Sequence, residues 1–141
     1  MGIVNIKNRI TGKIIKTYDT DCMEDHIFYD ENFNFADFSN QDLTSFNFIR
    51  CSFVGSTFKD SILNYGLFRW CLIDQTDFSL CELNKTIFCQ VSLINCSFMN
   101  SSLIKVKFIE SKLIMADLSN SFFRRCSFAG VDLVRGVNFI D

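Results

Sequence analysis

Cysteines carry the most obvious chemistry in this 141-residue chain, because seven of them accompany a single histidine. Thiolates can bind zinc or form disulfides, but zinc sites usually take ligand pairs close together in sequence, such as CxxC, and no such pair occurs. Five of the cysteines are instead separated by multiples of five residues: Cys51, Cys71, Cys81, Cys96 and Cys126. This spacing favours compact, core-filling thiols, so we expect no metal and no cofactor.

The remaining polar residues do not predict a catalytic site. No nucleophile or second acid converges on His26, so a structural or solvated histidine is the better interpretation. Asp37, Asp42, Asp77 and Asp117 each stand directly before an apolar residue, where a short acceptor can bond backbone N–H groups at a turn. The sequence has no P-loop, no dinucleotide fingerprint and no Ser-His-Asp set. We therefore predict that the chain is not an enzyme.

A period of five residues runs through most of the chain. From residue 28 to residue 133, 22 consecutive fifth positions are all Phe, Leu or Ile. These phased positions are Phe28, Phe33, Phe38, Leu43, Phe48, Phe53, Phe58, Leu63, Phe68, Ile73, Phe78, Leu83, Phe88, Leu93, Phe98, Leu103, Phe108, Leu113, Leu118, Phe123, Phe128 and Leu133. A period of five fits neither an α-helix nor a flat strand, so the chain must turn a corner once per unit to keep these side chains inside.

The order of Phe and Leu predicts how many faces this coil has. At the eleven positions from 28 to 128 in steps of ten, ten residues are Phe and only Leu118 differs. The eleven interleaved positions hold seven Leu, Ile73 and three Phe. Three units per turn would stack Phe on Leu, whereas four units keep one residue type in each column. We therefore expect a four-sided coil in which each side is one five-residue unit.

The residues two positions before the phased ones support this coil. They should also point inward, beside a large side chain, and 18 of the 22 are Ala, Cys, Gly, Ser, Thr or Val. The exceptions are His26, Glu31, Gln41 and Phe46, all near the start of the repeat. Gly66 follows Phe46 in its column one coil later, which predicts that the glycine leaves room for the oversized ring.

The five-residue phase also predicts where the cysteines lie in the coil. Cys51 and Cys71 should be direct neighbours in one column, but parallel Cβ directions make a disulfide torsion awkward, and whether they pair stays open. Cys89 follows a phased Phe and should face solvent. It is the thiol that we expect to react with a labelling reagent.

Units such as Ala-Asp-Phe-Ser-Asn at 36–40 and Ala-Asp-Leu-Ser-Asn at 116–120 resemble the pentapeptide-repeat family. The resemblance covers residues 26–135. It implies an all-β fold, a right-handed quadrilateral parallel β-helix, and the repeat length here corresponds to about five and a half 20-residue coils.

The residues before the repeat resemble a leader found in some bacterial members of this family. We interpret Ile6–Ile15 as part of a β-hairpin that turns at Thr11 and Gly12 and packs on the first coil as a partial cap. The stretch Asp19–Asp25 is expected to be a linker or one short helical turn. The predicted segments are a hairpin and linker at 1–25, the β-helix at 26–135 and a C-terminal end segment at 136–141.

Composition is typical of a single soluble domain. The chain has no proline, no uncharged stretch near the ~18 apolar residues of a membrane span, and no apolar signal-peptide segment. A cytoplasmic location without membrane contact follows by default.

One functional hypothesis comes from the resemblance. Some family members protect DNA gyrase by imitating a DNA duplex, which requires a long acidic surface. Here residues 17–49 contain eight acids and no Lys or Arg, but residues 50–141 contain eight acids and ten bases, and the formal net charge is only −2. The repeat also lacks a long interruption that would form a projecting loop. A gyrase inhibitor or protector that confers fluoroquinolone resistance is therefore the alternative, and direct nucleic-acid binding is not expected.

The favoured hypothesis is a non-enzymatic protein-interaction or scaffold module with an unidentified protein partner. Outward positions of the fourth coil hold an apolar belt, namely Ile94, Met99, Ile104, Ile109, Ile114 and Met115. Exposed apolar patches commonly mark contact surfaces. Strand propensity alone also explains β-branched residues on a flat face, so both interpretations stay open.

The C-terminal end predicts self-association. The phase slips by one residue at Asn138-Phe139, and no amphipathic helix follows to cover the last coil. Gyrase-protecting relatives dimerise through such ends, so the resemblance implies a homodimer joined through Phe128, Leu133 and Phe139.

Overall fold

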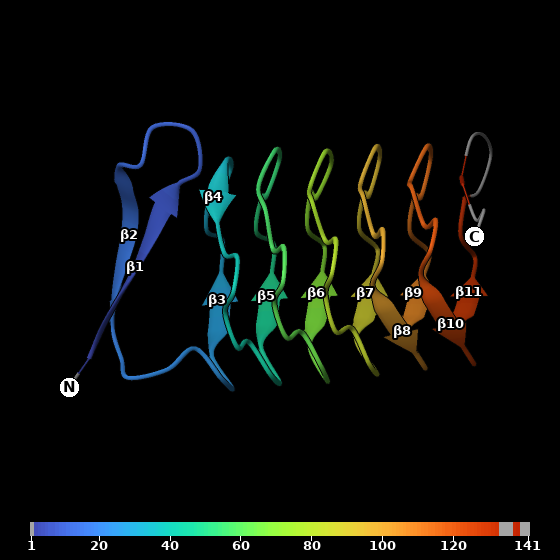
Figure 1. Cartoon of the computed structure of the whole chain (residues 1–141), viewed down its shortest axis with the longest axis horizontal. Coiled ribbons are helices and arrows are strands. Elements are labelled where there is room, and N and C mark those ends of the chain that lie inside the picture. Colours follow the sequence, from blue (N-terminus) through green and yellow to red (C-terminus); the bar gives the residue numbers. More distant parts are fainter. Residues whose placement is uncertain (1, 133–136, 139–141) are drawn as a thin grey trace.

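The computed structural model describes residues 2–132, 137 and 138. Eleven short β-strands and no helix occur in this part of the chain, and none of it forms a helix able to cross a membrane. Figure 1 shows coils of similar shape stacked along the long axis, with a hairpin at the N-terminal end. The protein is an all-β solenoid of about five turns, as the five-residue period predicts.

The hairpin consists of β1 (Ile3–Asn8) and β2 (Ile14–Asp19), which pair antiparallel. Its turn forms because the Asn8 side-chain oxygen accepts hydrogen bonds from two backbone N–H groups, those of Ile10 and Thr11, at 2.9 and 3.0 Å. Gly12 supplies the positive φ of 71° that the turn requires. The predicted hairpin and its turn are confirmed.

The hairpin also covers the first coil. β1 pairs antiparallel with β4 (Ala36–Asp37), a two-residue strand of that coil. Ile6 of β1 is buried in the core, with only 1% of its surface exposed. The coil geometry itself begins at Met23, which is buried in the column of Leu43, and its first corner is at Asp25.

One side of the solenoid is a continuous parallel sheet, called here the six-stranded face. Neighbouring strands pair with an offset of four repeat units, so that Phe28 lies beside Phe48 and Phe48 beside Phe68. Its strands form the row of arrows in Figure 1. They are β3 (Ile27–Tyr29), β5 (Asn47–Ile49), β6 (Leu67–Arg69), β7 (Ile87–Cys89), β9 (Lys107–Ile109) and β11 (Ser127–Ala129).

The other three sides are columns of single β-bridges with the same offset, named here after their first residues. The Asn32 face runs from Asn32 to Asp132, and the Asp37 face begins in β4. The Asp42 face ends in the parallel pair β8 (Ser102–Ile104) and β10 (Phe122–Arg124). Four columns per turn confirm the four-sided coil.

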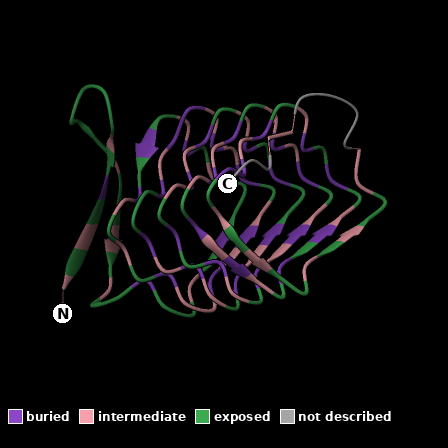
Figure 2. Cartoon of the chain, turned by 45° about the vertical axis from the view of Figure 1, so that its right-hand side comes forward, coloured by how far each residue is buried: buried purple, intermediate pink, exposed green. Residues whose placement is uncertain are grey.

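Phased residues fill the interior. All of those from Phe28 to Leu118 are buried, and Phe rings stack on Phe rings: Phe68 and Phe88 lie 5.0 Å apart with 2° between their planes. In Figure 2 buried positions recur along the earlier coils, whereas the last described coil is intermediate or exposed. Accordingly, Phe123 and Phe128 are only partly buried.

Gly66 and Phe46 form the predicted pair. A Cβ atom built on Gly66 would overlap the Cε1, Cζ and Cδ1 atoms of Phe46, so the Phe46 ring requires a glycine at this position one coil later. A second pair of this kind lies on an outer corner, where the Phe35 ring covers Gly55. At the other exceptional positions, His26, Glu31 and Gln41 are partly exposed near the capped end.

Each corner has a residue in the left-handed conformation, two positions after the phased one. In the described part of the chain, twenty of these residues are not glycine, with φ from 48° at Glu110 to 62° at Tyr65. Left-handed backbone is costly for such residues, but here the N–H of every corner residue from Asp25 to Glu110 donates to the next coil, as from Asp30 to Ile49 at 3.1 Å.

Two rows of corner residues border the six-stranded face. The Tyr65 edge consists of Asp25, Ser45, Tyr65, Lys85, Lys105 and Arg125. The Trp70 edge consists of Asp30, Arg50, Trp70, Gln90, Glu110 and Gly130.

The phase slip at the C-terminal end is confirmed. Asp117 bridges to Asn138, one position later along the chain than the regular offset between coils would place its partner. The Leu118 N–H donates to the Asn138 carbonyl at 2.7 Å.

Candidate functional site

The small inward residues make a hydrogen bond that the sequence did not reveal. In successive coils of one column, Ser61, Cys81 and Ser101 donate to the carbonyl of the phased residue 23 positions earlier, at 2.7, 2.9 and 2.6 Å. The thiol of Cys96 makes the same bond to Ile73 at 2.9 Å. Cysteine therefore takes the place of serine as a buried donor in this fold.

Burial controls the acidity of these thiols. It raises the pKa of Cys81 to about 12 and raises the pKa of Cys96 further. Cys51 and Cys71 are stacked, free thiols; the hydrogen bond between them, together with burial, raises the pKa of Cys71. The thiols of Cys71, Cys81 and Cys96 therefore remain protonated near neutral pH and are poor nucleophiles.

The surface thiol differs from the prediction. Cys89 is half-buried, because side chains next to a phased residue pack against their counterparts in adjacent coils. Cys22, before the repeat begins, is the exposed cysteine in the described part of the chain. The five-residue phase contains no signal for Cys22, which lies outside it.

His26 belongs to a packed cluster beneath the hairpin. Its ring lies 4.4 Å from the Phe28 ring and 5.2 Å from the Tyr18 ring. Beside them, Lys16 Nζ pairs with the Glu31 carboxylate at 3.0 Å. Burial and the nearby Glu31 carboxylate raise the pKa of Tyr18. These contacts hold the hairpin on the first coil.

The four carboxylates singled out by sequence bind backbone N–H groups two residues ahead. Asp77 Oδ1 accepts from the Ser79 N–H at 2.8 Å, and Asp117 Oδ1 accepts from Ser119 at 3.0 Å. Asp37 and Asp42 make the same contact. Their predicted role in turns is confirmed. In the part of the chain that the structure describes, no three or more His, Cys, Asp or Glu residues gather into a metal-binding group.

The structure distributes the apolar belt around the solenoid. Ile94 and Ile114 share the Asn32 face, with Met115 at the corner beside them, 59% exposed. The other three belt residues lie on three different faces: Met99 on the Asp37 face, Ile104 on the Asp42 face and Ile109 on the six-stranded face. Only the group of Ile94, Ile114 and Met115 is therefore compact enough for one flat partner.

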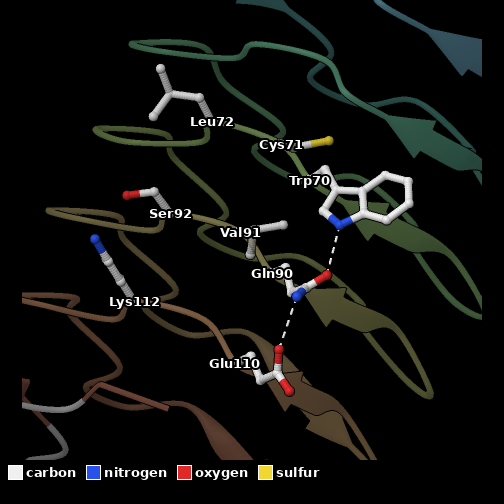
Figure 3. Close-up of a pocket in the computed structure, with 8 residues that line it drawn as sticks. All are labelled: Trp70, Cys71, Leu72, Gln90, Val91, Ser92, Glu110 and Lys112. Carbon is white, nitrogen blue, oxygen red and sulfur yellow. Dashed lines mark hydrogen bonds between the residues drawn. The ribbon is translucent and has the colours of Figure 1, made fainter. Parts of the chain in front are cut away.

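An open groove of about 480 Å³ lies between the Trp70 edge and the Asn32 face. Figure 3 shows a hydrogen-bonded row along one side of it: Trp70 Nε1 donates to Gln90 at 2.6 Å, and Gln90 donates to Glu110 at 2.9 Å. Leu72 and Lys112 line the other side. The Arg69 guanidinium lies 4.1 Å from the Trp70 ring centre. The groove thus combines an aromatic ring with both signs of charge.

The acidic first coil contains one strong charge pair. Arg50 binds Asp30 through two hydrogen bonds of 2.7 and 2.8 Å. The hydrogen bond from Arg50 lowers the pKa of the Asp30 carboxyl below its usual value. This pair neutralises part of the acidic band that the sequence predicts.

Comparison with family models identifies the repeat. Residues 41–118 match the model described as a pentapeptide repeat region, and residues 101–139 match a model of eight pentapeptide repeats. The chain belongs to the pentapeptide-repeat family. No curated protein matches this pentapeptide-repeat chain.

Several solved pentapeptide-repeat structures resemble this one. A protein from the Arabidopsis thaliana thylakoid lumen has a TM-score of 0.55 at 12% identity, covering 78% of this chain and 66% of its own. Rfr23 from the cyanobacterium Cyanothece 51142 has a TM-score of 0.47 at 17% identity, with 84% and 88% covered. QnrB1, a plasmid-mediated fluoroquinolone resistance protein, has 0.49 at 17%, with 84% and 79% covered. At these identities the similarity shows the fold alone.

Proposed function

We propose that this pentapeptide-repeat protein is a non-enzymatic interaction or scaffold module that binds an unidentified protein. The observation that carries the proposal is the filled interior: phased residues from Phe28 to Leu118 are buried and stacked, which leaves only outward side chains to contact other molecules. Its buried free thiols are typical of a reducing compartment, and we place it in the cytoplasm.

The candidate partner surface is the apolar belt, and its compact part is Ile94, Ile114 and Met115. The homodimer through the last coil stays a prediction, because Leu133 and Phe139 lie outside the residues that the structure describes; Phe128 is partly buried. Direct nucleic-acid binding is not part of the proposal.

A capture experiment tests the interaction surface. The protein is biotinylated at the exposed thiol of Cys22 and incubated with an extract of its source cells. Ile114→Lys on the Asn32 face should lose the captured proteins, whereas Ser39→Lys on the Asp37 face should retain them. If both variants capture the same proteins as the wild type, Ile114 is not at the interface.

The alternative is a DNA-mimicking gyrase inhibitor or protector, and the acidic band of residues 17–49 is the observation that favours it. A gyrase supercoiling assay, with and without a fluoroquinolone, separates the two functions. We expect no inhibition and no drug protection at low micromolar protein. Either effect would support the alternative and place the acidic first coil at the enzyme.

A further inference from the structure

The six-stranded face is the most apolar side of the solenoid. Of its twelve outward residues in the described coils, eight are apolar, against four of eleven on the Asn32 face, three of ten on the Asp42 face and one of eleven on the Asp37 face. Ile27 and Tyr29 at its N-terminal end are 49% and 54% exposed. A flat, apolar sheet is the kind of surface that a second sheet covers.

The six-stranded face and its two edges are complementary to the same surface of a second copy whose coils run in the opposite order. Two copies can be related by a twofold axis that runs parallel to the strands and passes midway between β6 and β7. This axis reverses the order of the coils, so that β3 of one copy faces β11 of the other. In this arrangement Leu67 faces Ile87, and Ile49 faces Ile109. Four apolar residues of the inner strands therefore meet apolar partners, whereas Arg69 faces Cys89.

The geometry points to an antiparallel homodimer packed through the six-stranded faces. The second copy of this chain is the occupant that the surface fits, because one symmetry operation matches both its apolar centre and its charged rims. This interface is separate from the C-terminal coil and from the surface assigned to another protein partner.

Charges along the Tyr65 edge change sign from one end to the other. Asp25 lies at the N-terminal end, and Arg125 occupies the equivalent position five coils later. Within the residues that the structure describes, Arg125 pairs with no carboxylate. Reversal places Arg125 of the second copy opposite Asp25.

The Trp70 edge also meets complementary residues in the reversed arrangement. Reversal sets Arg50 opposite Glu110 of the second copy, and Trp70 opposite Gln90. A parallel arrangement, by contrast, would bring the Tyr65 edge against the Trp70 edge and place Asp25 opposite Asp30. Like charges in direct opposition disfavour that arrangement.

The size of the face is sufficient for a moderate interface. Six strands about 4.8 Å apart make a sheet about 24 Å long, and together with its edges it would bury roughly 1,000 Å² in total, at the lower limit of specific interfaces. A reversible, salt-sensitive dimer is therefore expected rather than a permanent one.

Sedimentation equilibrium of the full chain tests the apolar centre. Ile87→Lys places two charges at the symmetry axis and should weaken the dimer about 100-fold. Ile114→Lys, the same change at a half-buried isoleucine of the Asn32 face, should leave the dimer unchanged. Matching circular dichroism melts of the two variants show that both remain folded.

A charge exchange tests the antiparallel pairing. Asp25→Arg and Arg125→Asp should each weaken the dimer, because each sets like charges against one another, and the double variant should restore it. A wild-type monomer at all concentrations would overturn the proposal. A dimer that Phe139→Lys abolishes but Ile87→Lys leaves intact would do so as well, and would assign dimerisation to the C-terminal coil.

Discussion

At the scale of single residues, the position two before each phased side chain has two requirements. The residue must be small enough to lie beside a ring, and a hydroxyl or thiol there binds the carbonyl of the phased residue in the preceding coil. The sequence predicted the first requirement from residue size. It could not predict the second, because the donor and its acceptor are 23 residues apart and meet only in the folded coil.

Cys81 should make the protein less stable in alkali. Its pKa rises from 9.0 to about 12 on folding, so its contribution to stability is complete below pH 9 and is lost as the pH rises toward 12. Cys81→Ser keeps the donor that Ser61 and Ser101 supply in the same column, but does not titrate. Urea unfolding at pH 8 and pH 10 should show the wild type losing about 1.4 kcal/mol more than the variant. Equal losses would mean that Cys81 titrates normally in the folded state.

Gly66→Ala should destabilise the protein by about 2 kcal/mol or more, because the new methyl group would overlap the Phe46 ring. Phe46→Val alone should also be destabilising, because it leaves a cavity in the core. The double variant should lose less than the sum of the two, since valine already occupies this column at Val106. Chemical denaturation of all four proteins measures the coupling, and strict additivity would contradict the proposed overlap.

At the scale of the repeating element, the corner decides how the chain turns. Nine of the 22 described corner residues are Asn, Asp or Gly, which tolerate left-handed backbone, but the others include side chains as large as Trp70, so residue type marks the corner only weakly. The phased positions were predictable because burial restricts them to a few apolar types. The corner was not, because its conformation is held by the backbone hydrogen bonds between coils and places few demands on the side chain.

Gln75→Gly should stabilise the protein by about 0.5 kcal/mol. Gln75 has a φ of 58°, and relief of left-handed strain should exceed the extra entropy of glycine in the unfolded chain. Asn95, one coil later in the same column, has a φ of 57° but tolerates this region better, so Asn95→Gly should change little. Urea midpoints measure both variants. A larger gain for Asn95→Gly would show that corner strain is not the cause.

At the scale of the whole molecule, residues of consecutive repeat units lie on different faces, and the residues that share a face are about 20 positions apart in sequence. The belt predicted from consecutive units of the fourth coil encircles the solenoid, because each unit of five residues turns the chain to the next face. The apolar six-stranded face is not apparent in the sequence, because its members recur only once per coil among unrelated outward positions. The number of coils and the buried residues were predictable from the period, but surface patches required the four columns to be aligned first.

The stacked architecture also makes the cost of losing a ring depend on its place along the axis. Phe88 lies between Phe68 and Phe108, with ring centres 5.0 and 5.1 Å away, and is fully buried. Phe128 stacks on Phe108 at 5.2 Å but is only partly buried. In a solenoid each coil is stabilised mainly by its immediate neighbours, so a central defect disrupts contacts on both sides.

Phe88→Ala should therefore cost about 3–5 kcal/mol in the free energy of unfolding, and Phe128→Ala about half as much. Native-state hydrogen exchange should separate the two effects. In Phe128→Ala, faster exchange should be confined to β11 and the amides that pair with it, because the loss affects one end of the stack. In Phe88→Ala, the strands on both sides of β7 should exchange faster together. If Phe128→Ala instead weakened protection equally along the whole solenoid, the coils would unfold as one cooperative unit, and position along the axis would not set the cost.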